Sequence, residues 1–295
     1  MHEHRTRAVL TALLAVAVAA LGLAGGASAK LVGNYTRFAQ CPYKNPEVAR
    51  CLYSTTNSGE VVLGKKTVPI EKAVVLQGGY AESDAKGNSK FIGATNGITL
   101  SKAAQNVPGG LLGIVPEASQ PPLVKALIKF FFENKLTGLT STLELAKSAS
   151  DIVVNEEALG GELGPGLTLP VKVHLENPFL GKSCFVGSSS SPITWELTSG
   201  TTSPPGPNKP ITGTLGEIQF LEGGSILETK GTKIVDNAWS APGASGCGGI
   251  LAFLVNPIIN SQLGTTTKGN NTAILNNTIF IAAAPAVKSN DEENP

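Results

Sequence analysis

The sequence predicts a mainly β fold, an antiparallel β-sandwich or barrel with one or two short amphipathic helices. Glycine and proline are frequent, at 34 and 19 residues, and are scattered between short runs rich in Val, Ile, Thr and Leu. This texture is typical of many short strands joined by turns. Apolar and polar residues alternate in residues 139–145 and 171–175, as in strands with one buried face. Strands of this kind favour antiparallel pairing.

The chain begins with a pattern typical of an export signal, and residues 1–29 are predicted to be a signal peptide cleaved between Ala29 and Lys30. Basic residues precede an apolar run at residues 8–23, which is followed by small residues. A charged start, an apolar stretch and a small-residue exit characterise secretory signals. A retained membrane anchor is the alternative, but a spanning helix needs about 20 apolar residues and this run is shorter. We therefore expect a secreted protein, located in the extracellular space or the cell wall.

Removal of the predicted signal leaves a mature chain with balanced charge. It takes away two of the 23 basic and one of the 22 acidic residues, which leaves 21 of each. A nucleic-acid partner normally requires a basic excess, so none is expected. No second apolar stretch approaches the length of a membrane span, so no integral span is expected after signal removal. A lipid or another apolar small molecule stays open as a partner, without a specific one being indicated.

Four cysteines remain, and we expect them to form two structural disulfides, Cys41–Cys51 and Cys184–Cys247. An even count in an oxidising compartment favours disulfides, and four cysteines allow three pairings. Cys41 and Cys51 enclose a short, proline-containing segment that readily folds back on itself, which favours this pairing. A zinc site is the alternative, but it needs C-x-x-C or Cys/His spacing, which does not occur.

Further strands are predicted along the chain, separated by turn residues. Pro69 marks an edge strand or a bulge. Residues 83–88 are predicted to form a turn. A calcium site at Glu82, Asp84 and Asn88 is the alternative, but the segment lacks a D-x-[DN]-x-[DN]-G loop. The predicted strands are residues 61–63, 73–77, 91–92, 139–145, 171–175, 193–198, 216–221, 226–229, 233–235 and 277–282.

An apolar loop and an amphipathic helix follow one another in the first half of the chain. The helix is predicted to start at residues 121–122 and to end before Gly138, with apolar residues recurring at i, i+4 and i+8. The preceding loop, residues 107–116, is either a buried connection under this helix or a mobile flap over a lipid-sized cavity. The candidate ligand-binding or flap residues are Leu111, Leu112, Ile114, Leu127 and Phe131.

A second helical segment is predicted at residues 249–264. Its apolar residues keep helical spacing, but Asn256 and Pro257 interrupt the pattern. Because proline breaks the interior of a helix, we expect either two short helices or a turn leading into a helix capped by Asn256.

The mature chain is expected to form one domain over residues 30–288. A faint echo between residues 67–78 and 168–177 raises two related halves as an alternative, although chance composition explains it equally well. Residues 289–295 are polar and acidic, and they are predicted to form a disordered tail.

The mature chain shows no catalytic constellation, so no catalytic, cofactor-binding or metal-binding residue is predicted. Its single histidine, His174, lies on the polar face of an alternating strand and is expected on the solvated surface. A serine hydrolase would need this histidine as its base. The G-x-S-x-G elbow of many such enzymes is absent, and the nearest match ends in Cys247. Trp195 and Trp239 are assigned to packing in the core or the sheet.

Four stretches of the mature chain carry a resemblance. They are F-x-x-C-P-x-x-N-P-x-x-x-x-C at residues 38–51, V-L-Q-G-G at 75–79, T-S-G-T-T-S-P-P-G-P-N-K-P-I at 198–211 and A-P-G-A-S-G-C-G at 241–248. Together they resemble a group of uncharacterised secreted proteins of high-GC Gram-positive actinobacteria, over most of the mature chain. The resemblance implies an exported protein and supplies no catalytic residues. A cholesterol-esterase label on similar chains implies a hydrolase, which the missing elbow does not support.

The preferred hypothesis is a non-catalytic secreted or cell-envelope-associated β protein whose role is binding or surface structure. An apolar ligand between its sheet and its helices is one option for this role, and the sequence specifies none. Two alternatives stay open. One is a secreted hydrolase of the esterase or lipase type, and the other is a secreted inhibitor or partner-binding module. An enzyme is disfavoured because no nucleophile, base and orienting acid are recognisable together.

Overall fold

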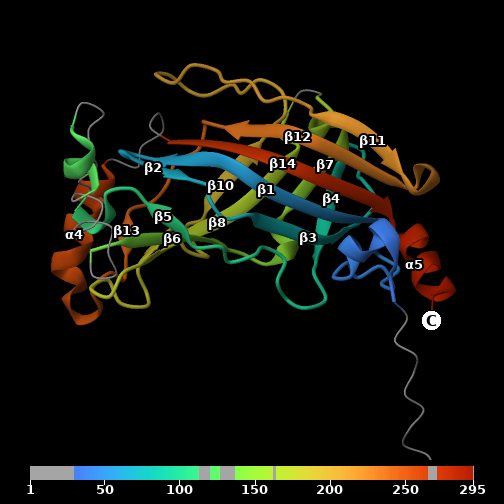
Figure 1. The fold of residues 1–295 in the computed structure, drawn as a ribbon, viewed down its shortest axis with the longest axis horizontal. Helices are drawn as coiled ribbons and strands as arrows, with labels where there is room; N and C mark the ends of the chain where they lie inside the picture. Colours follow the sequence, from blue (N-terminus) through green and yellow to red (C-terminus); the bar gives the residue numbers. More distant parts are fainter. Residues whose placement is uncertain (1–29, 113–119, 127–136, 162–163, 265–270, 295) are drawn as a thin grey trace, which may run out of the picture.

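The described part of the chain forms a continuous antiparallel sheet that folds over into two layers (Figure 1). The computed structural model describes residues 30–112, 120–126, 137–161, 164–264 and 271–294. The predicted fold class, a mainly antiparallel β protein with a large sandwich-like sheet and a few short helices, is confirmed.

The first layer contains the longest strands, which run side by side across the molecule in Figure 1. Buried and less buried residues alternate along β14 (Asn271–Ala283), so one face of the layer packs inward. The strands of this layer are β1 (Arg50–Leu63), β2 (Lys66–Pro69), β3 (Val74–Tyr80), β11 (Glu217–Leu221), β12 (Ile226–Asp236) and β14 (Asn271–Ala283).

The second layer is reached through β4 (Asn88–Gly93), which pairs with a strand of each layer. Its residues 91–93 pair with β3, and its residues 88–90 pair with β7 (Val153–Asn155). The remaining strands of this layer are β5 (Gln105–Val107), β6 (Leu139–Leu145), β8 (Leu167–Glu176), β9 (Phe185–Val186), β10 (Ile193–Leu197) and β13 (Ala244–Ser245).

Hydrogen-bonded neighbours follow the order β11-β12-β14-β1-β3-β4-β7-β8-β6-β5. The register of β1 against β14 shifts between Thr56 and Ser58, which indicates a bulge. Gly59 follows this shift with φ of 131°, and a Cβ at this position would collide with the carbonyl oxygen of Ile274. Glycine is therefore required where the two longest strands bend together.

Each predicted strand overlaps an observed one, and the two predicted segments at 226–229 and 233–235 belong to the single strand β12. Pro69 ends the edge strand β2, as expected. The two segments of the sequence echo differ in position, because residues 67–70 lie in and just after an edge strand and residues 168–171 lie in the central strand β8.

The buried side chains form two clusters. The larger lies between the two layers and includes the tryptophans Trp195 and Trp239, whose rings are 6.0 Å apart. Their predicted role in packing is confirmed. The smaller cluster lies where β1, β12 and β14 meet η1 (Gly33–Phe38) and α5 (Ala284–Glu293). The other short helices are η3 (Ala149–Asp151), α3 (Glu156–Leu159) and η4 (Glu222–Gly224).

Both predicted disulfides are present. Cys41–Cys51 belongs to the smaller cluster, and Cys184–Cys247 joins the start of β9 to the segment after β13. All four cysteines are buried. Two structural disulfides indicate that the protein folds in an oxidising environment.

The C-terminal residues differ from the predicted disordered tail. Helix α5 continues to Glu293, and within it Val287 and Asp291 are buried. The carboxylate of Asp291 lies 2.8 Å from the ammonium of Lys44, and the backbone N–H of Lys30 donates to the carbonyl of Asn294. The acidic composition was misleading because the carboxylate of Asp291 has a cationic partner and the side chain of Val287 joins the smaller buried cluster.

The second predicted helical segment is also more regular than expected. After η5 (Gly249–Leu251), helix α4 (Ala252–Leu263) runs without interruption through Pro257. Asn256 does not cap a helix; its side chain accepts a hydrogen bond from the backbone N–H of Cys247. In the described residues, no helix is both long and apolar enough to cross a membrane.

Candidate functional site

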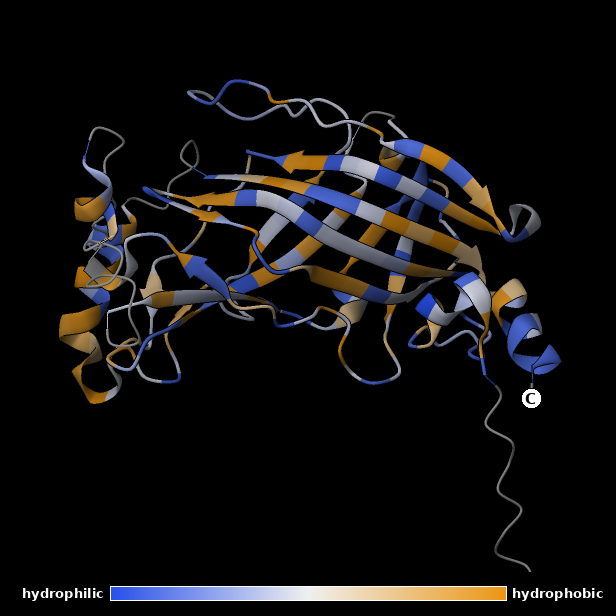
Figure 2. Ribbon diagram, in the orientation of Figure 1, coloured by the Kyte–Doolittle hydropathy of each residue, from blue (hydrophilic) through white to orange (hydrophobic). Residues whose placement is uncertain are grey.

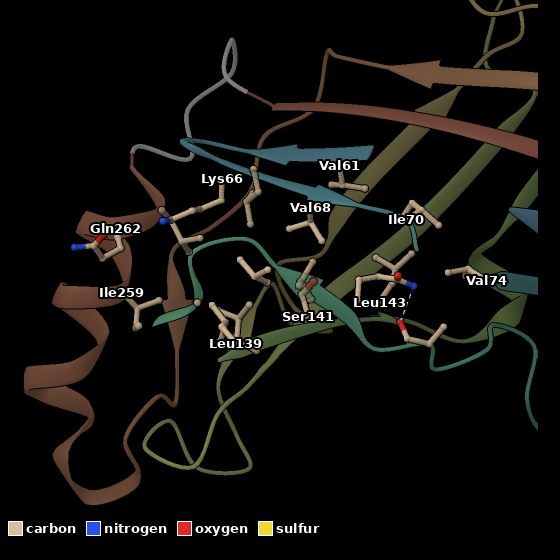
Figure 3. Close-up of a pocket in the computed structure, with 18 of the residues that line it drawn as sticks. Val61, Lys66, Val68, Ile70, Val74, Leu139, Ser141, Leu143, Ile259 and Gln262 are labelled. Carbon is tan, nitrogen blue, oxygen red and sulfur yellow. Dashed lines mark hydrogen bonds between the residues drawn. The ribbon is translucent and has the colours of Figure 1, made fainter. Parts of the chain in front are cut away.

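An apolar cavity of about 90 Å³ lies between the two layers, at the end of the sandwich that α4 covers (Figures 1 and 3). Three parts of the fold form its walls. The first layer contributes Val61, Leu63, Val68, Ile70, Val74 and Leu275. The second layer contributes Val107, Leu139, Leu143, Val173, Leu175 and Trp195, and the end of the sandwich contributes Leu111, Ile259 and Leu263.

The alternation along β6 and β8 explains the apolar wall of the second layer. Successive residues of a strand point to opposite faces. Leu139, Ser141 and Leu143 of β6 therefore line the cavity, and so do Val173 and Leu175 of β8. The polar residues between them face away from it. The same period-two pattern that predicts these strands thus supplies one wall of the site.

Helix α4 closes the end of the cavity because two of its residues, Ile259 and Leu263, lie one turn apart on one face and are both buried. The helix is fixed to β13 by Asn260, which accepts from the backbone N–H of Ala244 at 2.6 Å and donates to its carbonyl at 3.2 Å. Because β13 leads directly to Cys247, the disulfide and the helix support each other.

The outer face of this end is apolar as well. The exposed fractions of Ile250 and Phe253 are 95% and 72%, and the chain carries no charged residue between Asp236 and Lys268. Figure 2 shows α4 as mainly hydrophobic, in contrast to α5. Leu251, Leu254, Ile258 and Leu123 are also exposed.

Five polar side chains interrupt the apolar lining: Thr56, Lys66, Gln105, Ser141 and Gln262. Two of them are used inside the protein. The amide of Gln105 accepts from two backbone N–H groups and donates to two carbonyls, and the hydroxyl of Thr56 donates to Asn277. Among the described residues, no hydrogen bond holds the side chains of Lys66, Ser141 or Gln262. The amide of Gln262 points away from the cavity (Figure 3), so Lys66 and Ser141 are the two that a ligand could use.

Of the candidate residues predicted from the sequence, Leu111 lines the cavity. The backbone of Leu112 belongs to η2 (Gly110–Leu112). Ile114, Leu127 and Phe131 lie outside the described residues, as does Ala29, so the choice between a buried connection and a flap stays open. Residues 122–126 of the predicted first helix are helical.

Sequence reasoning missed most of the cavity wall. Leu63, Val68 and Leu275 come from strands far apart in the chain, and their sequence neighbours give no sign that they meet. A usable signal existed for Ile259 and Leu263, because an uncharged segment with apolar residues at i and i+4 predicts a buried helical face.

His174 is not the solvated residue that was predicted. Its side chain is 17% exposed, and its ring stacks on Phe185 with centroids 4.3 Å apart. Its Nδ1 lies 3.8 Å from a carboxylate oxygen of Glu144 and 3.9 Å from one of Glu176. The burial arises because β9 pairs with β8 and places Phe185 opposite His174. In the described chain, no serine or cysteine forms a hydrogen bond with this histidine.

The segment considered as a calcium loop is a hairpin turn. One oxygen of Asp84 accepts the backbone N–H groups of Lys86 and Asn88, at 2.8 and 3.0 Å. These hydrogen bonds lower the pKa of Asp84, because they stabilise its charged form. Within the described ranges, no group of three His, Cys, Asp or Glu residues is arranged to hold a metal ion.

No family model matches the chain, and neither the curated proteins nor the solved structures contain a match. The case for a function therefore rests on the geometry of the cavity.

Proposed function

We propose that this protein is a non-catalytic, exported binding protein that takes up an apolar small molecule between its two β layers. The observation that carries the proposal is the cavity at the α4 end, whose described lining is apolar except for five polar side chains. Protein interiors are normally packed without voids larger than a water molecule. An unfilled apolar space bounded by both layers and a helix is therefore suited to a ligand.

The size of the cavity favours a small ligand. Its volume of about 90 Å³ is below the about 300 Å³ at the lower end of drug-sized ligand pockets. In another protein, an apolar cavity of about 150 Å³ takes a single benzene ring. By this measure the cavity takes a short alkyl group of about three or four carbons, and a fused-ring sterol is too large for it.

Export is part of the proposal and rests on the signal pattern at residues 1–29 together with the two disulfides. A binding protein in the extracellular space or cell envelope would hold apolar molecules that water dissolves poorly. The burial of a methylene group contributes about 0.8 kcal/mol, so each carbon of a chain accommodated in the cavity strengthens binding measurably.

The fluorescence of the two tryptophans offers a direct test. Trp195 lines the cavity and Trp239 packs against it, and they are the protein's two tryptophans. We expect 1-alkanols added to the oxidised chain 30–295 to change the emission in a saturable way, with affinity rising with chain length until the cavity is filled. Native mass spectrometry of the same samples should show one bound alkanol.

A matched pair of variants locates the binding. Ser141→Phe places a ring in the cavity and should abolish the response, whereas Thr140→Phe places the ring on the opposite face of β6 and should preserve it. The absence of saturable binding for every chain length would refute the proposal. Equal affinity in both variants would place the ligand elsewhere.

A further inference from the structure

The half-buried lysine at the rim of the cavity defines a second part of the site. Lys66 is the first residue of β2, immediately after the turn that joins β1 to β2. Figure 3 shows Lys66 and Gln262 on the side of the cavity nearest α4. Gln262 is exposed although it lines the cavity, and we take this side as the opening.

No anionic partner of the described chain faces Lys66. The described cavity lining contains neither aspartate nor glutamate. Burial alone lowers the pKa of Lys66, and no neighbouring carboxylate opposes this effect. A cation that loses part of its hydration without a compensating charge is unfavourable. An anion at the opening of the cavity would remove this cost.

We propose that the ligand is a short linear alkyl carboxylate, with its chain in the apolar cavity and its carboxylate paired with the ammonium of Lys66. This inference rests on the proposed function and specifies its ligand class. A single lysine balances the one charge of a carboxylate, whereas the dianion of a phosphate monoester would keep an uncompensated charge.

The neighbouring lysine provides a matched control. Lys65 precedes Lys66, is exposed, and does not line the cavity. Lys65→Met therefore removes the same charge from the same turn at a side chain that does not line the cavity. Lys66→Met removes the charge at the opening and keeps a long side chain, and Lys66→Arg keeps the charge.

The experiment compares three ligands with one short chain length and different head groups: butanoate, 1-butanol and butyltrimethylammonium. The chain length is chosen because the cavity takes about three or four carbons. Binding is measured by tryptophan emission at pH 7.5. We expect the wild type and Lys65→Met to bind butanoate at least about tenfold more tightly than 1-butanol, as a charge-assisted hydrogen bond allows. Lys66→Arg should keep this preference. Lys66→Met should lose it while binding 1-butanol as well as the wild type does.

The outcomes separate this inference from the proposed function. Equal affinity of the wild type for butanoate and 1-butanol would overturn the inference and support the binding function alone. A preference for the cationic ligand, or a carboxylate preference that persists in Lys66→Met, would also overturn it. If none of the three ligands binds, both proposals fail. The head-group comparison on the wild type decides the matter even if a variant does not fold.

Discussion

The two ends of the sandwich are built differently, although β1 and β14 run through both. At the α5 end, the Cys41–Cys51 disulfide, the buried Phe38 and the buried Val287 form a small filled core. At the α4 end, the core contains a cavity, and the helix that covers it is apolar on its outer face (Figure 2).

Charge is distributed in the same unequal way. At the α5 end, Lys44 pairs with the buried Asp291 at 2.8 Å, and Arg50 pairs with Glu156 at 2.8 Å. At the α4 end, Lys66 has no such partner in the described chain. One end is thus completed by its own side chains, while the other keeps both unfilled apolar volume and an unpaired cation. This difference is the reason why we propose the α4 end as the binding end.

The largest expected effect is the loss of the disulfide at the α4 end. The residues of Cys184–Cys247 are 63 positions apart and those of Cys41–Cys51 are 10 apart, so loop entropy gives about 4 and about 3 kcal/mol. Cys184→Ala with Cys247→Ala should lower the free energy of unfolding in urea by the larger amount and weaken alkanol binding. The matched Cys41→Ala, Cys51→Ala variant should keep binding, and equal weakening in both would contradict the assignment of the binding end.

Truncation of one isoleucine at each end tests the difference in packing. Ile226 is fully buried in the smaller cluster, whereas Ile259 already borders the cavity. A side chain beside empty space has fewer contacts to lose, so we expect Ile226→Ala to cost about 4 kcal/mol and Ile259→Ala about 2 kcal/mol. Urea unfolding measures both. A larger cost for Ile259→Ala would show that the cavity end is as tightly packed as the other.

Removal of one lysine at each end should shift stability in opposite directions. Lys44→Met strands the buried carboxylate of Asp291 and should lower the urea midpoint, whereas Lys66→Met removes a partly desolvated, unpaired charge and should raise it slightly. A decrease for both variants would mean that Lys66 has a stabilising anionic partner.

The effect of Lys44 also has a defined pH dependence. The hydrogen bond and charge of Asp291 raise the pKa of Lys44 above its ordinary value of 10.5. Because the folded-state pKa is the higher one, the stabilisation is complete below pH 10.5 and is lost as the pH rises through the folded-state value. The difference between Lys44→Met and the wild type should therefore be constant at neutral pH and shrink only in strong alkali.

The smallest effect is expected for His174→Ala. His174 lies on the face of β8 opposite the cavity, so alkanol affinity should not change, and the lost stacking on Phe185 should cost about 1 kcal/mol. An ester hydrolysis activity of the wild type that disappears in this variant would instead favour the hydrolase alternative.

The success of the sequence-based predictions depends on the range of the interactions involved. Residues 139–145 are predicted from their own alternation and coincide with β6, and the Cys41–Cys51 pairing follows from its short separation. The prediction that His174 is solvated was wrong because its burial depends on Phe185, which a different strand supplies. The prediction of a disordered C-terminal tail was wrong because the cationic partner of Asp291, Lys44, lies near the other end of the chain.

The sequence by itself determined the fold class, the approximate strand positions and the disulfide pairing, because period-two alternation and cysteine spacing are local properties. Only the tertiary structure decided that there is a cavity and which residues line it. Val68, Leu143 and Ile259 approach one another from three distant elements, and the order in which strands pair is a long-range property. Unfilled volume is what packing leaves over between such elements, and for that reason no local pattern encodes it.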